Sequence, residues 1–231
     1  MTSVANGIRV AIDGPSGSGK SSVSKKVAAH LGIGYLDTGA MYRALTWYCL
    51  DRGIDLDDQG AVADAVTAMP LEMGTDPSAP SISMGATRID ADIRTTRIAE
   101  VVSKVATNLQ VRPKLQQHQR ELMAQIAADQ GGVVAEGRDI TTVVAPDADV
   151  RILMVASEAA RLARRSKELH GGADDAAIAA TRTQIVDRDK ADSTVSSFMS
   201  AADGVVTLDT SDLTFQQSVE AVLTLVERAR G

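Results

Sequence analysis

Cysteine and aromatic residues are scarce in this sequence of 231 residues, and each scarcity excludes a class of protein. Cys49 is the only cysteine, so neither an intrachain disulfide nor a zinc site built on several cysteines can form. Aromatic side chains make up 3% of the residues, which leaves few surfaces on which the bases of a single-stranded nucleic acid could stack. We therefore expect a protein of a reducing compartment that is not a nucleic-acid scaffold.

A long hydrophobic run and an excess of positive charge are also missing. No stretch approaches the roughly 18 apolar residues of a membrane helix, and the segment MTSVANGIRVAIDG lacks the positively charged start of a secretion signal. Lys and Arg number 24 against 30 Asp and Glu, a formal net charge of −6, which argues against binding nucleic acid over the whole surface. With 44% hydrophobic and 23% charged residues, we expect a cytoplasmic globular protein that binds no membrane and binds anions only locally.

Short β-rich segments alternate with helical patterns along most of the chain. The expected strands lie at residues 8–13, 33–36, 132–137, 149–156 and 204–210. The helical segments between them predict parallel strands joined by crossovers. The expected fold class is therefore α/β, with helices flanking a parallel sheet.

Residues 70–92 interrupt this alternation. Their β-rich pieces, LEMG, SISMG and TRIDAD, are short and broken by Gly and Pro, so they predict a small antiparallel insertion. Two helices are expected next, one with an apolar stripe from Ile98 to Val105 and a second that opens at Pro113. Ser157, after the fourth expected strand, is a candidate helix cap.

Residues 14–21, GPSGSGKS, fit the phosphate-binding pattern G-x-x-x-x-G-K-S/T between an expected strand and an expected helix. Small residues let backbone N–H groups close around phosphate oxygens, and the helix start adds a favourable dipole. Lys20 would bring its charge to the β- and γ-phosphates, and Ser21 is the candidate Mg²⁺ ligand. A glycine-rich turn that matches by chance is the alternative, and the flanking elements argue against it. The candidate nucleotide-binding residues are Gly14, Pro15, Ser16, Gly17, Ser18, Gly19, Lys20, Ser21 and Ser22.

Polar residues follow three of the expected strands at the point where each ends. The first strand leads into the phosphate loop, the second into Asp37-Thr38-Gly39 and then Arg43, and the third into Glu136-Gly137-Arg138-Asp139. Parallel strands end at one edge of a sheet, where open α/β sheets bind ligands, so these residues should share a cleft. Taken alone, Arg43 fits a solvated helix residue and Arg138-Asp139 a surface ion pair, but the shared edge favours an anion site.

Two further stretches are rich in basic residues. Residues 88–120 carry seven Lys and Arg against three Asp and Glu, which fits a solvated helix face and a phosphate-binding wall equally well. Ser103 lies off the apolar stripe of its helix, so its hydroxyl is available to solvent or to a ligand. Arg161, Arg164 and Arg165 fit either an exposed charged helix or a basic lid that closes on transferring phosphates.

Several longer segments together resemble the bacterial cytidylate kinases, a family of nucleoside monophosphate (NMP) kinases. They are IDGPSGSGKSS near the start, YLDTGAMYRA at 35–44, IRTTRIAEVVSKVATNLQVRPKLQQHQR at 93–120, EGRDITTVV at 136–144 and RDKADST at 188–194. The resemblance covers nearly the whole chain. It implies a monomeric P-loop kinase of pyrimidine metabolism that transfers the γ-phosphate of ATP to CMP or dCMP with Mg²⁺, and whose only partners are small molecules.

The resemblance also implies a domain division and residue roles. The P-loop core, with a five-stranded parallel sheet, would comprise residues 1–69 and 131–231 with a lid near 160–175, and residues 70–130 would form the NMP-binding insertion. Thr38, Arg112 and Asp139 would contact the cytosine, Arg43 and Arg138 would hold the acceptor phosphate, and Ser103, Arg188 and Asp192 would lie near the ribose. The catalytic residues would be Lys20, Arg138, Arg161, Arg164 and Arg165.

The chain departs from the family pattern after Asp192. The family commonly has an arginine three residues later and then a Pro-Leu pair, whereas here Val195 is followed by SSFMSAAD. One phosphate-contacting arginine is therefore expected to be missing. Lys190, Arg182 or a lid arginine could substitute for it.

A preference for cytosine also has a physical basis that is independent of the resemblance. An ionised Asp139 accepts a hydrogen bond from the 4-amino group of cytosine but faces a carbonyl oxygen in uracil. An unpaired buried polar group costs roughly 1 to 3 kcal/mol, so discrimination of about tenfold to a few hundredfold against UMP is expected.

Two rival functions remain open. A P-loop kinase for UMP, AMP or another small hydroxyl compound would share the donor site. A GTPase-type switch would need the guanine-binding pattern N/T-K-x-D after a strand. The nearest match, DKAD at 189–192, begins with Asp and follows an expected helix, which argues against the switch.

Overall fold

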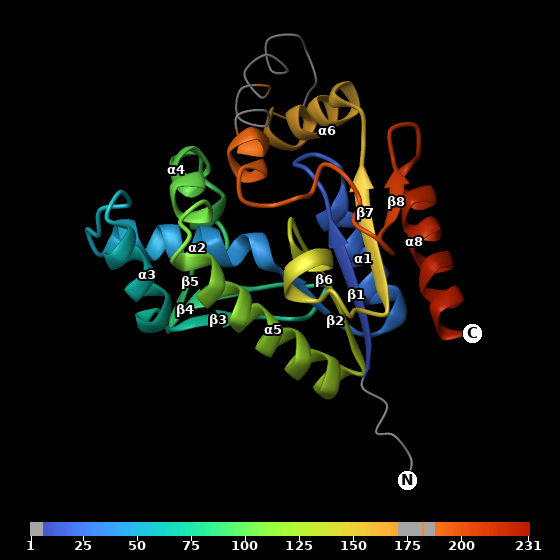
Figure 1. Ribbon diagram of the computed structural model, residues 1–231, viewed down its shortest axis with the longest axis horizontal. Coiled ribbons are helices and arrows are strands. Elements are labelled where there is room, and N and C mark those ends of the chain that lie inside the picture. Colours follow the sequence, from blue (N-terminus) through green and yellow to red (C-terminus); the bar gives the residue numbers. More distant parts are fainter. Residues whose placement is uncertain (1–6, 171–181, 183–187) are drawn as a thin grey trace.

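A five-stranded parallel sheet lies at the centre of the molecule (Figure 1). The computed structural model describes residues 7–170, 182 and 188–231. The strands stand in the order β2 (Gly34–Asp37), β6 (Gly132–Gly137), β1 (Ile8–Asp13), β7 (Val150–Val155) and β8 (Val206–Asp209). The predicted α/β class and parallel sheet are confirmed. Because β1 lies between β6 and β7, the loop that follows β1 leaves from the middle of the sheet.

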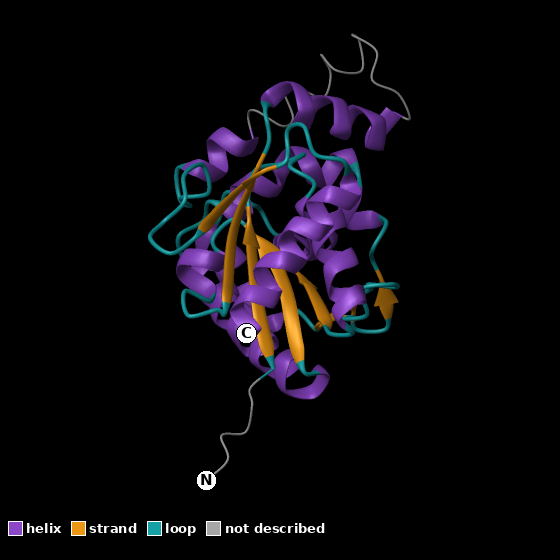
Figure 2. Cartoon of the chain, turned by 90° about the vertical axis from the view of Figure 1, so that its right-hand side faces the viewer, coloured by secondary structure: helices purple, strands orange, loops and turns teal. Residues whose placement is uncertain are grey.

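Helices cover both faces of this sheet (Figure 2). Alternate residues of a strand point to opposite faces, so Val10 and Ile12 of β1 pack on one side and Ala11 on the other. The first face is covered by α1 (Lys20–Leu31) and α8 (Phe215–Arg230). The second is covered by α5 (Val111–Gln130) and the short helical turn η2 (Ile140–Val144). Strands β1, β6 and β7 are therefore largely buried on both faces, which explains their nearly continuous apolar sequences, whereas β8 at the edge of the sheet is mostly exposed.

A second hydrophobic cluster lies beside the sheet and contains the predicted antiparallel insertion. Its elements are α2 (Thr38–Asp51), α3 (Gln59–Ala68), β3 (Leu71–Met73), β4 (Ile82–Met84), β5 (Thr87–Arg88), η1 (Asp92–Arg94) and α4 (Thr96–Ala106). Buried residues from Ala40 to Leu115 form one cluster, and Cys49 is fully buried within it. Helix α3 was not predicted from the sequence, although Asp58 caps it by accepting a hydrogen bond from Ala61 N–H.

The helix predicted to open at Pro113 begins two residues earlier, at Val111. Proline fits there because the first N–H groups of a helix have no intrahelical partner. Ser157 is confirmed as the cap of α6 (Glu158–His170), since its hydroxyl accepts a hydrogen bond from Ala160 N–H at 3.3 Å.

Part of the predicted lid, residues 171–175, lies outside the described residues, as does most of the helix predicted before Arg188; residues 188–193 are helical. Over the described part of the chain, every helix is too short or too polar to cross a membrane.

Candidate active site

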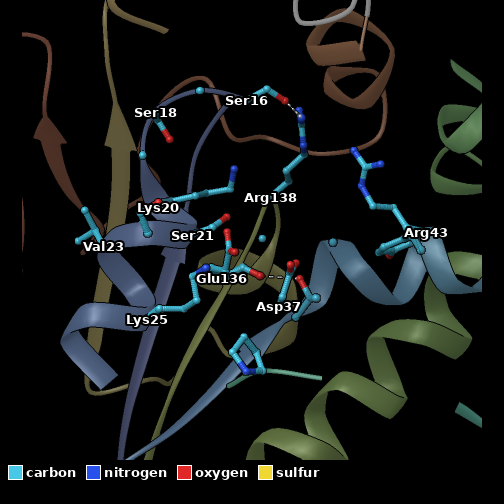
Figure 3. Close-up of a pocket in the computed structure, with 18 of the residues that line it drawn as sticks. Ser16, Ser18, Lys20, Ser21, Val23, Lys25, Asp37, Arg43, Glu136 and Arg138 are labelled. Atoms are coloured by element: carbon cyan, nitrogen blue, oxygen red, sulfur yellow. Dashed lines mark hydrogen bonds between the residues drawn. The ribbon is translucent and has the colours of Figure 1, made fainter. Parts of the chain in front are cut away.

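A cavity of about 650 Å³ opens where β1, β2 and β6 end (Figure 3). It brings together residues of the phosphate loop, the start of α2, α4, α5, the end of β6, α6 and the segment after residue 187. The expectation that the strand-end loops share one cleft is confirmed. The predicted residues that line it are Ser16, Gly17, Ser18, Gly19, Lys20, Ser21, Ser22, Thr38, Arg43, Arg112, Arg138, Asp139, Arg164, Arg165, Arg188 and Asp192.

The phosphate loop connects β1 to α1. No side chain caps the start of α1, so its first N–H groups are open to an anion. Gly17 has a φ of 79°, and a Cβ there would lie 2.7 Å from the Arg161 carbonyl oxygen, so only glycine fits. Lys20 Nζ donates a hydrogen bond to the Pro15 carbonyl at 3.3 Å, which folds the lysine back along the loop.

A buried carboxylate lies beside Lys20. Glu136, at the end of β6, is 2% exposed and its Oε1 accepts a hydrogen bond from the Tyr35 hydroxyl at 2.9 Å. Burial lowers the pKa of Lys20, and burial together with the nearby Asp37 raises the pKa of Glu136. Figure 3 shows Lys20, Ser21 and Glu136 close together, with Arg43 extending from α2 across the cavity. The sequence placed Glu136 at this strand end, but Glu136 was not among the predicted site residues.

Asp13, the last residue of β1, holds the loop that carries Arg138 and Asp139. Its carboxylate is 1% exposed and accepts hydrogen bonds from Ile140 N–H at 2.9 Å, Thr141 N–H at 2.7 Å and the Thr141 hydroxyl at 2.6 Å. Burial raises the pKa of Asp13 to about 6. The residue immediately before the phosphate loop therefore fixes the loop that follows β6.

Asp139 and Arg112 form a buried ion pair on the wall of the cavity. Asp139 Oδ2 accepts hydrogen bonds from Arg112 Nη2 at 2.6 Å and from Gln116 Nε2 at 2.7 Å. The two side chains are 7% and 11% exposed. Because Oδ2 is shared by two donors, Oδ1 is the carboxylate oxygen available to a ligand.

Thr38 and Gly137 pack closely against each other. The Thr38 hydroxyl donates to the Glu136 carbonyl at 2.7 Å, and a Cβ at Gly137 would lie 2.4 Å from that hydroxyl oxygen. Thr38 is 2% exposed, so its contact with cytosine stays a prediction.

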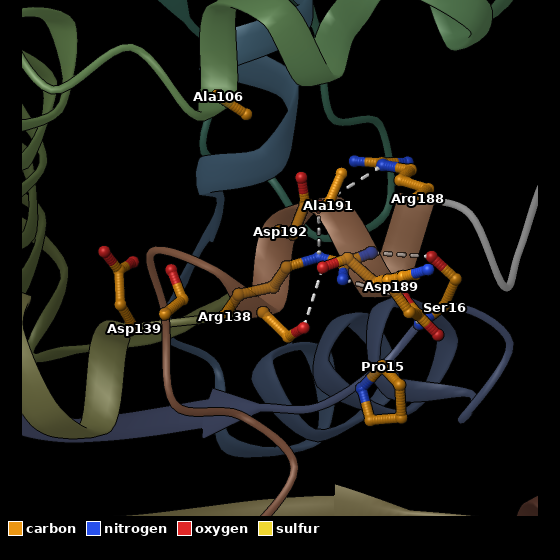
Figure 4. Close-up of polar contacts among 12 residues, drawn as sticks. Pro15, Ser16, Ala106, Arg138, Asp139, Arg188, Asp189, Ala191 and Asp192 are labelled. Atoms are coloured by element: carbon orange, nitrogen blue, oxygen red, sulfur yellow. Dashed lines mark hydrogen bonds and ion pairs between the residues drawn. The ribbon is translucent and has the colours of Figure 1, made fainter.

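Arg138 is held by carboxylates of the segment after the lid (Figure 4). Its Nη1 donates to Asp189 at 2.8 Å, its Nε lies 3.1 Å from Asp192 Oδ2, and its Nη2 donates to the Ser16 hydroxyl at 2.7 Å. The guanidinium also lies over the ring of Phe198, 4.5 Å from the centroid. The arginine predicted to hold the acceptor phosphate thus links the phosphate loop to residues 189–198. Asp189 was not among the predicted site residues.

Arg43 and Arg188 add two further positive charges to the lining of the cavity. Arg43 donates to the Ile93 carbonyl at 3.1 Å. Burial and the neighbouring guanidinium groups lower the pKa of Arg43 to about 9 and that of Arg188 to about 10. Within the described residues, Arg188 Nε and Asp192 Oδ1 are buried without a hydrogen-bond partner, and Arg188 Nε lies 3.6 Å from Asp192 Oδ2 as an ion pair. Such orphaned polar atoms on a cavity wall suit a polar ligand.

The three arginines of α6 differ in their surroundings. Arg161 donates to the Ser16 carbonyl at 3.0 Å and to Asp189, and it does not line the cavity. Arg164 lines the cavity and donates to the Ser18 carbonyl at 3.3 Å and to the Thr210 carbonyl at 2.5 Å. Arg165 also lines it. In this structure Arg161 and Arg164 support the phosphate loop, and their contact with a phosphate stays a prediction.

Some predicted residues lie away from the cavity. Gly14 and Pro15 lie in the phosphate loop without lining the cavity, and Ser103 is half-buried on α4 between two alanines that do line it. Of the suggested substitutes for the missing arginine, Lys190 is exposed and Arg182 forms an ion pair with Glu158 at 3.0 Å. Neither lines the cavity, so Arg164 and Arg165, which do line it, are better placed to substitute for the missing arginine.

The basic stretch at 88–120 was expected to be either a solvated helix face or a phosphate-binding wall, and each interpretation holds for part of it. Several of its side chains pair with acids outside the cavity, such as Lys104 with Asp57 at 2.6 Å and Lys114 with Asp64 at 3.4 Å. Arg94 and Arg112 line the cavity. Most of the stretch is therefore a solvated face, and two of its arginines reach the site.

The fold and the site together define a class of protein. A phosphate loop at the end of the central strand lines one cavity together with several arginines from other elements, which is the arrangement of a P-loop kinase. The family model described as "Cytidylate kinase" matches residues 10–228. The chain belongs to the cytidylate kinase family.

Two cytidylate kinases of Streptomyces are similar to this chain over nearly its whole length. A cytidylate kinase of Streptomyces avermitilis is 49% identical over 223 residues, which cover 96% of this chain and 94% of that protein. A cytidylate kinase of Streptomyces coelicolor is 47% identical over 228 residues, which cover 98% of this chain and 96% of that protein. Among solved structures, shikimate kinase from Acinetobacter baumannii in complex with shikimate is 13% identical with a TM-score of 0.42, covering 96% of this chain and 94% of that one.

Proposed function

We propose that the chain transfers the γ-phosphate of ATP to CMP or dCMP, giving ADP and CDP or dCDP. The observation that carries this proposal is the buried Arg112–Asp139 pair, which lines the same cavity as the phosphate loop. The Asp139 carboxylate accepts hydrogen bonds from Arg112 and Gln116 through Oδ2. Its other oxygen would accept a hydrogen bond from the amino group of cytosine, whereas uracil has a carbonyl oxygen at that position.

Phosphoryl transfer here needs positioning and charge neutralisation rather than a covalent intermediate. The acceptor phosphate is already an anion near neutral pH, since its second pKa is about 6, so an oxygen of CMP can attack the γ-phosphorus as the bond to the β-phosphate oxygen of ATP breaks. Lys20 and the loop N–H groups would hold the donor phosphates. Arg43, Arg138 and Arg188 would hold the acceptor phosphate and ribose, and Arg138 would exchange Asp189 for phosphate oxygens.

A magnesium ion would fit beside Ser21. The Ser21 hydroxyl lines the cavity next to Glu136, and both supply the oxygen ligands that Mg²⁺ prefers. No cluster of three His, Cys, Asp or Glu side chains suited to a metal occurs in the described residues. Ser21 would therefore hold the ion together with nucleotide oxygens, and the ion would neutralise phosphate charge.

The remaining expectations complete the proposal. Residues 70–130 would form the NMP-binding insertion and residues near 160–175 the lid of a P-loop core that spans 1–69 and 131–231. The chain would act as a cytoplasmic monomer in pyrimidine metabolism, without nucleic acid or membrane partners, since one chain supplies both sides of the cavity. Size-exclusion chromatography with light scattering would test the monomer.

A coupled assay of ADP formation tests the activity. CMP and dCMP should be phosphorylated with ATP and Mg²⁺, and UMP and AMP much less efficiently. Higher efficiency with UMP or AMP would establish one of the rival kinases. Rapid hydrolysis of ATP at a rate that none of these nucleotides increases would refute the proposed phosphate transfer.

A further inference from the structure

The segment 196–198, where the chain departs from its family, touches both acceptor-site arginines. The Ser196 hydroxyl accepts a hydrogen bond from Arg112 Nη2 at 2.8 Å. Phe198 lies under the guanidinium of Arg138 and is fully buried. One short segment between residues 188–193 and β8 therefore contacts the base site and the phosphate site at once.

Ser196 completes the hydrogen bonding of Arg112. Arg112 Nη2 donates to both Asp139 and Ser196, and Nη1 donates to the Ala106 carbonyl at 3.1 Å. The guanidinium is thus held from three directions, and Asp139 is fixed by the same group. Without the serine hydroxyl, one N–H of a nearly buried cation would lose its acceptor.

The location of Ser196 supports a role in recognising the cytosine base of the substrate. Its side chain lines the cavity, whereas the next residue, Ser197, is exposed. Phe198 anchors the segment because its ring is buried against Arg138. Ser196 thereby has a fixed backbone from which to reach Arg112.

We propose that Ser196 is a positioning residue for cytosine recognition, acting through Arg112 to orient Asp139. This inference rests on the proposed function. The family pattern would place a phosphate-contacting arginine at the position of Val195. In this chain the segment that follows Val195 would instead position Arg112 and Arg138, which other elements supply.

Three variants test the proposal: Ser196→Ala, Ser196→Thr and the matched control Ser197→Ala. For Ser196→Ala, kcat/KM with CMP should fall about tenfold, as expected for the loss of one hydrogen bond to a charged group. The value with UMP should change by less than about threefold, and KM for ATP should stay constant. Ser196→Thr keeps the hydroxyl and should recover most of the loss, and Ser197→Ala should match the wild type in all these values.

The outcomes separate this proposal from the one it rests on. A wild-type enzyme that does not favour CMP over UMP would refute the proposed function itself. If the wild type favours CMP but Ser196→Ala behaves like Ser197→Ala, the role of Ser196 is wrong. Equal losses with CMP and UMP, together with a raised KM for ATP, would also overturn it, because they indicate a general structural role.

Discussion

Replacing Asp139 with asparagine should weaken the preference for CMP with little change in shape. The Asp139 side chain is 7% exposed, and its Oδ2 accepts hydrogen bonds from Arg112 and Gln116, so Oδ1 is the oxygen that would accept from the cytosine amino group. An asparagine amide can keep its carbonyl on Arg112 and place its NH₂ group where Oδ1 was. That group would oppose the amino group of cytosine and donate to the carbonyl of uracil.

The expected magnitude follows from one mismatched buried pair. A buried donor without an acceptor costs about 1 to 3 kcal/mol, which corresponds to a fall of about 5- to 150-fold in kcat/KM with CMP. The value with UMP should stay constant or rise. Asparagine is preferred to alanine because removing the acceptor entirely would leave Arg112 as an unpaired buried cation, at a cost of about 3 to 5 kcal/mol in stability.

Initial rates of ADP formation at saturating ATP, with CMP or UMP varied, would measure this change. KM for ATP and the thermal unfolding midpoint serve as controls, since the phosphate loop is untouched. Equal losses of kcat/KM for CMP and UMP would refute the argument, because a carboxylate that does not meet the base cannot discriminate between them.

Three further predictions follow from the buried charges. Lys20→Met should lower kcat at least about 100-fold while KM for CMP changes little, because Lys20 acts on transferring phosphates; steady-state kinetics with both substrates varied would show it, and a retained kcat would contradict it. Asp189→Ala should destabilise the protein by about 3 to 5 kcal/mol in urea unfolding, because Arg138 and Arg161 lose their shared carboxylate, and an unchanged midpoint would exclude this. Asp13 has a folded pKa of about 6 against an ordinary 3.8, so its protonation favours the fold; relative to Asp13→Asn, the wild type should lose up to about 3 kcal/mol as the pH rises from 4 to 7, and a constant difference between the two proteins would contradict the buried pKa.

The central sheet and the phosphate loop could be predicted because their signals are local. The apolar run IRVAID followed by GPSGSGKS specifies a strand, a loop and a helix over adjacent residues. The shared cleft also followed from sequence, since parallel strands end at one edge. The predicted first residue of α5 was wrong by two residues, because a proline such as Pro113 is tolerated anywhere in the first turn of a helix.

The roles of Asp13 and Asp189 could not be predicted, because the partners of these two carboxylates are remote in sequence. Asp13 binds Thr141, and Asp189 binds Arg138, at separations of 128 and 51 residues. Spacing rules describe neighbours on one helix or strand and carry no information about such pairs. The same holds for Ser196, which is 84 residues from Arg112.

The burial of Cys49 gives this protein an intrinsic reporter of local opening. The thiol is fully buried in the hydrophobic cluster that runs from Ala40 to Leu115, here called the α2 cluster, and burial raises its pKa to about 11, so the reactive thiolate is nearly absent from the native protein. With no second sulfhydryl to compete, an alkylating reagent would modify the chain only when the α2 cluster opens. The labelling rate, with and without nucleotides, would therefore measure how strongly each ligand holds the acceptor side together, without any engineered probe.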